Sequence, residues 1–213
     1  MTDTIHLVMD NLKKNRFAVH YVEKKEEVPA LVREWIPVGS TIATGGSRSL
    51  EDAGVMDVIR SGDYVYYDRM DPSLTPEQRQ EMMHKASSAD FYLCSSNAVT
   101  EAGELYNVDG NCNRISALVF GPKSVILVVG INKIVPNLEA AIRRVKTIAA
   151  PLNTQRLNCD TYCRNTGSCM GLDGQMTDGC HSSARICCNY LVSGQQRVQD
   201  RIRIILVGEH LGF

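Results

Sequence analysis

The spacing of apolar residues along the first half of the chain alternates between that of helices and that of strands. Ile5, Val8, Met9 and Leu12 recur at intervals of three and four residues, which predicts an amphipathic helix with one buried face. Residues 17–22 follow with the β-branched and aromatic content of a strand. The same alternation continues, with helices predicted at 28–35, from 50 onward and at 76–88, and strands at 40–44 and 63–67.

The predicted helix at 76–88 has a defined start. Thr75 suits the N-cap position, Pro76 suits the first helical position, and Gln78 is placed to close a capping box with Thr75. These three residues predict the helix even though its apolar stripe is weak.

Three short apolar runs, 90–94, 116–120 and 125–129, have the length of strands. Their apolarity is continuous rather than alternating, which is typical of strands buried on both faces of a parallel or mixed sheet. A helix at 138–148 and a last strand at 202–207 complete the pattern. We therefore expect one α/β domain over residues 1–213, a mixed or parallel sheet flanked by helices, with a cysteine-rich insert at 158–189.

Composition and charge exclude several classes of protein. With 44% hydrophobic and 22% charged residues, the chain resembles an ordinary globular protein rather than a disordered one. The formal charge of −1 leaves no domain-wide basic field for nucleic acid. The longest apolar runs are far shorter than the ~18 residues of a membrane span, and the first residues lack a signal-peptide pattern. We expect a cytoplasmic protein, with a homodimer as the base-rate oligomer.

The first candidate site is the turn Gly45, Gly46 and Ser47, which follows a predicted strand and precedes a helix. Backbone N–H groups at such a turn suit a phosphate or carboxylate, and glycine lets the ligand approach the backbone. An ordinary tight turn has the same sequence, so on this stretch alone the two interpretations are equal.

The second candidate site is the polar segment 95–114, directly after a buried strand, where ligands of open α/β sheets bind. Here we expect Glu101 to act as base or nucleophile and Arg114 as an anion clamp. Lys133 follows another strand and is a candidate for the same crevice, whereas the simpler interpretation is a lone surface lysine. The alternative is that the segment only makes turns. The further candidate ligand-binding residues are Asn97, Thr100, Asn107, Asp109 and Asn113.

The third candidate site is a group of cysteines near the C-terminus. Six of the eight cysteines lie in the last quarter of the chain, and in a reducing compartment such clustering indicates metal or redox chemistry rather than disulfides. Four thiolates suit Zn²⁺ or an iron–sulfur cluster, and the spacing alone does not separate the two.

Several long peptides resemble the lactate-utilisation (LUD) domain family, in order along nearly the whole chain. They are residues 89–114, 120–125, 129–135, 144–153 and 207–213. The resemblance implies the α/β fold of sugar-phosphate isomerases and CoA transferases. It also implies that the turn Gly45–Ser47 holds an anionic part of the ligand.

The resemblance further implies a set of four metal ligands, Cys163, Cys169, Cys180 and Cys187. Two departures from the family pattern stand out: Tyr162 replaces the usual proline, and the gap between Cys169 and Cys180 is long. Either residues 171–177 form a loop that leaves the ligand set intact, or Cys159 or Cys188 replaces one ligand.

The function implied by the resemblance is a redox role in organic-acid metabolism of the lactate type. The chain would bind a small carboxylate or phosphorylated metabolite together with an iron–sulfur cluster, expected to be 4Fe–4S, and act with iron–sulfur redox partner proteins. Two alternatives stay open. One is a non-catalytic assembly subunit with structural zinc, and the other is an isomerase or CoA-transferase-like enzyme on the same fold.

Overall fold

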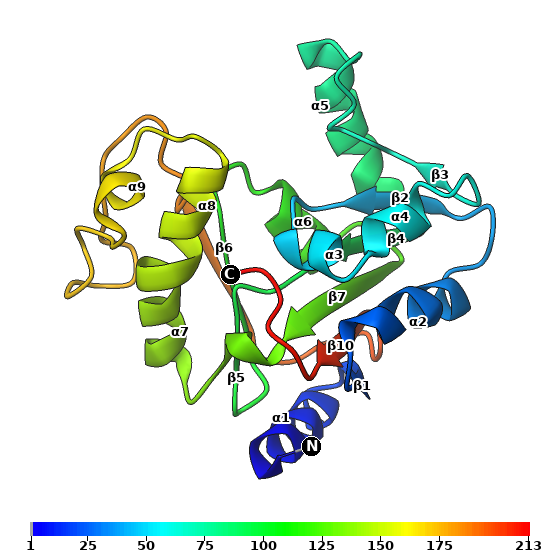
Figure 1. The fold of residues 1–213 in the computed structure, drawn as a ribbon, viewed down its shortest axis with the longest axis horizontal. Coiled ribbons are helices and arrows are strands. Elements are labelled where there is room, and N and C mark those ends of the chain that lie inside the picture. Colours follow the sequence, from blue (N-terminus) through cyan, green and yellow to red (C-terminus); the bar gives the residue numbers. More distant parts are fainter. Residues whose placement is uncertain (1) are drawn as a thin grey trace.

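The main element of the fold is a six-stranded sheet in which every neighbouring pair of strands is parallel (Figure 1). This computed structural model describes residues 2–213. The strand order is β1-β10-β7-β4-β2-β3. In that order the strands are β1 (Ala18–Val22), β10 (Ile202–Val207), β7 (Ser124–Gly130), β4 (Phe91–Cys94), β2 (Thr41–Thr44) and β3 (Val65–Tyr66).

The central strands are buried on both faces, as their continuous apolarity predicts. In β7, Val125, Leu127 and Val129 belong to one hydrophobic cluster, whereas Ile126 and Val128 belong to the cluster on the opposite face. Strand alternation sends successive side chains to opposite sides, so both faces of the sheet must be covered. The predicted α/β class is confirmed.

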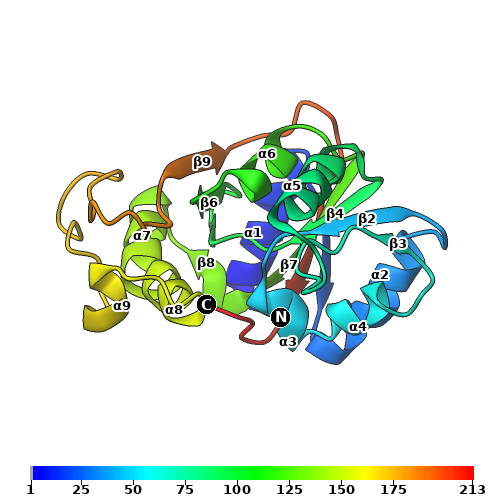
Figure 2. The same ribbon diagram turned by 90° about the horizontal axis from the view of Figure 1, so that it is seen from above.

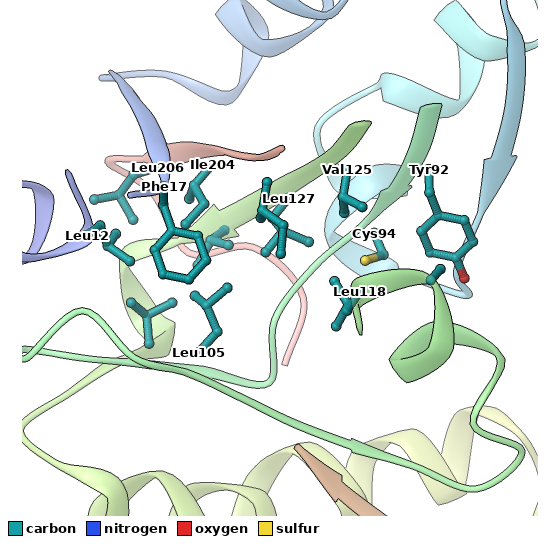
Figure 3. Packing of buried hydrophobic residues seen from close by; sticks show 14 of the residues in the cluster. Leu12, Phe17, Tyr92, Cys94, Leu105, Leu118, Val125, Leu127, Ile204 and Leu206 are labelled. Atoms are coloured by element: carbon teal, nitrogen blue, oxygen red, sulfur yellow. The ribbon is translucent and has the colours of Figure 1, made fainter. Parts of the chain in front are cut away.

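Helices cover both faces of the six-stranded sheet (Figure 2). On one face lie α2 (Val28–Trp35), α3 (Arg48–Asp52) and α4 (Val55–Ile59). On the other face lie α1 (Asp3–Lys14) and α6 (Asn113–Val119), together with residues of a second sheet. Figure 3 shows the face covered by α1 and α6. Side chains from α1, the six-stranded sheet and the second sheet pack together there around Phe17 and Leu127.

The second sheet has four strands in the order β8-β5-β6-β9. Strands β5 and β8 are parallel, and β6 runs antiparallel to both β5 and β9. The strands are β8 (Ile134–Val135), β5 (Ala98–Thr100), β6 (Leu105–Asp109) and β9 (Asn189–Ser193). We expected a single sheet and interpreted 95–114 as a polar segment. That expectation missed β5 and β6, because their apolar residues are interrupted by buried polar ones such as Thr100 and Asn107.

The outer face of the second sheet packs on a continuous run of helix. It begins with α7 (Leu138–Arg144), continues as a π-helical segment (Val145–Ala149) and ends as α8 (Ala150–Arg156). The cysteine-rich residues follow between α8 and β9 and contain one short helix, α9 (Tyr162–Thr166). Figure 1 shows α7 and α8 as one column of helix on the flank away from α2, with α9 beside α8.

The prediction of a strand at 116–120 is wrong, because α6 ends there instead. Only Ala117 and Leu118 are buried, whereas Val119 and Phe120 are 59% and 84% exposed. An apolar run of this length does not distinguish a helix end from a strand by periodicity alone.

The capped helix is confirmed as α5 (Pro76–Lys85), followed by a 3₁₀ turn (Ala86–Ser88). The Gln78 N–H donates to the Thr75 hydroxyl, and the Gln78 side chain accepts from the Thr75 N–H at 2.9 Å. The helix has no buried residue and projects from the body of the molecule in Figure 1. None of the helices within residues 2–213 is long and apolar enough to cross a bilayer.

Candidate functional site

A cavity of about 420 Å³ lies at the carboxyl ends of β2, β4 and β7. Residues just beyond these strands line it on one side, and α8 and residues 183–187 line it on the other. The crevice beyond the carboxyl ends of the strands is the usual ligand site of an open parallel sheet. Of the residues expected to bind or act on the anion, those that line the cavity are Gly46, Ser47, Asn97, Asp109, Asn113, Arg114 and Lys133.

The cavity is strongly basic although the chain as a whole is almost neutral. Among the lining residues within 2–213, Asp109 is the only acidic one, against six basic ones: Arg48, Arg69, Arg114, Lys133, Arg156 and Arg185. A concentration of one sign of charge in a cleft favours a ligand of the opposite sign. The lining therefore suits a small anion.

The guanidinium group of Arg114 hydrogen-bonds to neighbouring protein groups, so it does not serve as a contact for a ligand. Its Nε donates to Asp109 Oδ1 at 3.1 Å, and its Nη1 donates to the Ser95 carbonyl at 3.1 Å and to the Asn107 side chain. Its Nη2 donates to Asn97 Oδ1 at 2.8 Å and forms an ion pair with Asp109 at 2.9 Å. Arg114 thus ties β4, β5 and β6 together below the cavity, and its role is to position these strand ends.

Lys133 is the most unusual charged group in the cavity. Only 3% of it is exposed, and its Nζ donates to Ser49 Oγ at 2.8 Å and to Ser95 Oγ at 3.0 Å. Burial, followed by the positive charges of Arg144 and Arg114, lowers the pKa of Lys133 to about 7. An amine with this pKa exchanges a proton near neutral pH, as a general acid or base does.

The packing below the turn leaves no room for a side chain at Gly45. A β-carbon at Gly45 would lie 3.0 Å from Cys94 Cβ and 3.2 Å from both the Arg114 Cδ and the Tyr92 hydroxyl. Glycine is therefore required here by the close approach of the neighbouring strand. Cys94 itself is fully buried, and burial raises the pKa of its thiol to about 12, so it serves as a core residue.

Two arginines in the lining were missed by the sequence analysis. A β-carbon at Gly46 would lie 3.3 Å from Arg69 Nη2 and 3.6 Å from Arg156 Nη2, so both guanidinium groups reach the glycine turn. Arg69 follows β3 by three residues, and this position after a parallel strand is the signal that could have identified it. Arg156 ends α8, and nothing in its local sequence predicts where it lies.

Glu101 and Thr100 lie outside the cavity lining. Strand β5 leaves the cavity after Asn97, and its three residues span about 10 Å. At its far end, Asn11 of α1 donates to the Glu101 carbonyl at 2.8 Å, and the Thr100 hydroxyl donates to Glu104 at 3.0 Å. The structure therefore does not bring Glu101 together with Lys133.

The four cysteines of the expected ligand set line a second, smaller cavity of about 30 Å³. Cys163 comes from α9, Cys169 and Cys180 from the following loop, and Cys187 from the residue pair before β9. Cys159 and Cys188 do not line it. Burial and then the neighbouring thiols Cys163, Cys169 and Cys180 raise the pKa of Cys187 to about 12. Four cysteines of one short stretch, residues 163–187, thus line one space.

The long gap between Cys169 and Cys180 is taken up by a loop that closes on itself. Lys146, at the edge of the π-helical segment, donates from Nζ to the carbonyls of Gly171 and Gln175, the latter at 2.7 Å. Arg185 then donates to the Thr177 and Cys180 carbonyls at 2.7 and 2.8 Å. These contacts bring the end of the loop back next to its beginning, so Cys169 and Cys180 line the same cavity.

The fit of this cavity to a metal depends on which metal is considered. Among residues 2–213, no group of three or more His, Cys, Asp or Glu side chains is arranged to hold a metal ion. A single zinc ion needs four sulfurs at about 2.3 Å from one centre. A cuboidal iron–sulfur cluster instead takes one thiolate at each of four separated corners, and four cysteines, the number that such a cluster needs, line this cavity.

The two cavities share a wall. Arg185, Ile186 and Cys187 line both, as do Val145 of the π-helical segment and Ala150 of α8. Short π-helical segments are frequent at functional sites. The basic cavity and the cysteine cavity are therefore neighbouring parts of one region.

The sequence model of the LUD domain matches residues 5–207, so the chain belongs to the LUD-domain family. A similar solved structure is a DUF162 family protein from Deinococcus radiodurans, with a TM-score of 0.52, 16% identity and 96% of each chain covered. That similarity shows a shared fold. No curated protein matches the chain.

Two further solved structures are less similar. One is eIF2B beta from Chaetomium thermophilum, with a TM-score of 0.38, 12% identity, and coverage of 65% of this chain and 48% of that one. The other is ribose 5 phosphate isomerase A from Neisseria gonorrhoeae, with a TM-score of 0.34, 13% identity and 54% of each chain covered.

Proposed function

We propose that this chain binds a small anionic metabolite in the basic cavity and an iron–sulfur cluster at Cys163, Cys169, Cys180 and Cys187, in a redox role in organic-acid metabolism of the lactate type. The observation that carries the proposal is the shared wall, because Cys187 lines both the basic cavity and the cysteine cavity. Membership of the LUD-domain family supports the metabolic context.

The chain's own residues have separate tasks in this proposal. Arg69 and Arg156 attract and hold the anion, and Arg114 keeps the strand ends below it in place. Lys133 accepts or returns a proton at its Nζ, which Ser49 and Ser95 orient. A bound cluster supplies one-electron chemistry next to the ligand.

Anaerobic purification followed by iron and acid-labile sulfide analysis tests the cluster. We expect about four iron and four sulfide per chain, with broad visible absorbance from thiolate–iron charge transfer. Replacing Cys163 and Cys187 by serine should remove both elements. The matched control is Cys159→Ser with Cys188→Ser, because these two cysteines do not line the cavity. Iron content that is the same in both double variants would end the assignment.

A second candidate function is proton transfer on the same fold, in an isomerase or transferase, with structural zinc at the cysteines. The specific observation in its favour is Lys133, a buried amine with a pKa of about 7 inside the basic cavity. One zinc per chain without visible absorbance would favour this candidate over the first.

A further inference from the structure

We infer that the anion bound in the basic cavity is a phosphate monoester, and that its phosphate group lies between Arg69 and Arg156 above Gly46. The inference rests on the proposed function and narrows its ligand from any small anion to a phosphorylated one.

The first support is the convergence of two guanidinium groups on one glycine. The position of a β-carbon on Gly46 is 3.3 Å from Arg69 Nη2 and 3.6 Å from Arg156 Nη2. Asn153 Oδ1 accepts from Arg156 Nε at 3.1 Å and from Nη2 at 2.9 Å, which fixes the direction of this guanidinium. Glycine leaves open the space that these two groups face.

The second support is the absence of a neutralising carboxylate. Within residues 2–213, neither Arg69 nor Arg156 takes part in an ion pair. Two like charges that approach the same point repel each other unless an anion lies between them. By contrast, Arg48 is paired with Glu51 at 3.2 Å and with Asp52 at 2.8 Å, so its charge is already compensated.

The third support is a pair of buried polar atoms at the same place. The Ser47 hydroxyl and the Arg69 Nε are both shielded from solvent and lack a hydrogen-bond partner within the described chain. Buried polar atoms are normally satisfied, and an ordered water or a bound ion is one of the usual partners of such an exception. Both atoms belong to residues that line the basic cavity.

Phosphate fits these donors better than carboxylate does. A carboxylate has two oxygens and one negative charge, which a single guanidinium satisfies by two parallel hydrogen bonds. A phosphate monoester has three terminal oxygens and up to two negative charges, enough for two guanidinium groups and a hydroxyl. Ser47, Ser49 and Lys133 all line the same cavity, so the organic part of such a ligand shares this cavity with the Lys133 amine.

Isothermal titration calorimetry with inorganic phosphate and with lactate, on anaerobically purified protein, tests the inference. Gly46→Ala places a methyl group between the guanidinium groups and meets only flexible side-chain ends. Arg69→Gln and Arg156→Gln each remove one charge. The controls are Gly194→Ala, which meets nothing within 4 Å, and Arg79→Gln on the exposed face of α5.

We expect phosphate to bind the wild type and both controls alike, and the three site variants at least tenfold more weakly, with unchanged far-UV circular dichroism. Phosphate affinity that is unaffected by Gly46→Ala would overturn the inference. So would binding of lactate without binding of phosphate, but that result would leave the proposed function in place. If neither anion binds, both the inference and the proposed anion-binding function fail.

Discussion

The charge state of Lys133 gives a prediction about stability that can be worked out from the structure. Burial lowers the pKa of Lys133 to about 7 in the folded protein, against the ordinary value of 10.5 for an exposed lysine. Between these two values the unfolded chain binds more protons than the folded protein does. Stability therefore rises with pH in this window, by up to about 1.4 kcal/mol per pH unit.

The pH range of the measurement is best limited to about pH 7 to about pH 8.5, which is the window used below. Below it, both states carry the proton and Lys133 adds no pH dependence. Above it, the cysteines titrate, and the raised pKa values of Cys94 and Cys187 act in the opposite direction. Within the window, the two Lys133 pKa values give a gain in unfolding free energy of about 1.6 kcal/mol as pH increases.

The perturbation is Lys133→Met, which keeps a long side chain and removes the titrating amine. We measure the unfolding free energy of reduced protein by urea denaturation at four pH values in this window. It should rise by about 1.6 kcal/mol less in the variant than in the wild type. The control is Lys13→Met on the exposed face of α1, whose profile should match the wild type. Equal slopes in Lys133→Met and wild type would refute the account of Lys133 as a buried, easily deprotonated amine.

Three further predictions concern the scaffold, two of them below the cavity and one at the start of α5. Arg114→Lys keeps the charge but loses about three hydrogen bonds to the strand ends. We therefore expect the unfolding free energy, measured by urea denaturation, to fall by about 3 kcal/mol. A fall of less than about 1 kcal/mol would contradict the role of Arg114 in holding the strand ends together. Gly45→Ala should destabilise by about 1–3 kcal/mol because its nearest neighbour is only 3.0 Å away, whereas Gly194→Ala should leave the thermal midpoint unchanged. Thr75→Ala should weaken the start of α5 by about 1 kcal/mol, seen as faster amide hydrogen exchange near Gln78, because this helix buries no residue and depends on its cap. Exchange that is unchanged in the variant would show that another contact holds α5.

The sequence predicted the parts of the fold that depend on local or periodic signals. Strands such as β7 and β10 are mostly apolar and were found at nearly their full length. The start of α5 was found from three residues with a defined capping role. The run at 116–120 was misassigned because the burial of Ala117 and the exposure of Phe120 depend on tertiary packing, which five residues do not encode.

The candidate site was predicted in composition but not in arrangement. Polar residues after β4 do lie at the cavity, yet the direction of β5 carries Glu101 away from it, and only the pairing of β5 with β6 and β8 determines that direction. Arg156 reaches Gly46 from a helix about 110 residues further along the chain, and no local motif marks such a contact.

The central claim is that the cysteine cavity holds a cluster next to a bound anion. Electron paramagnetic resonance of the reduced, anaerobically purified protein tests it most directly, with lactate or phosphate titrated into the sample. The account predicts an iron–sulfur signal whose g-values shift as the anion binds, because Cys187 lines both cavities. A sample without iron, or a signal that stays the same while calorimetry records saturation with the anion, would contradict it.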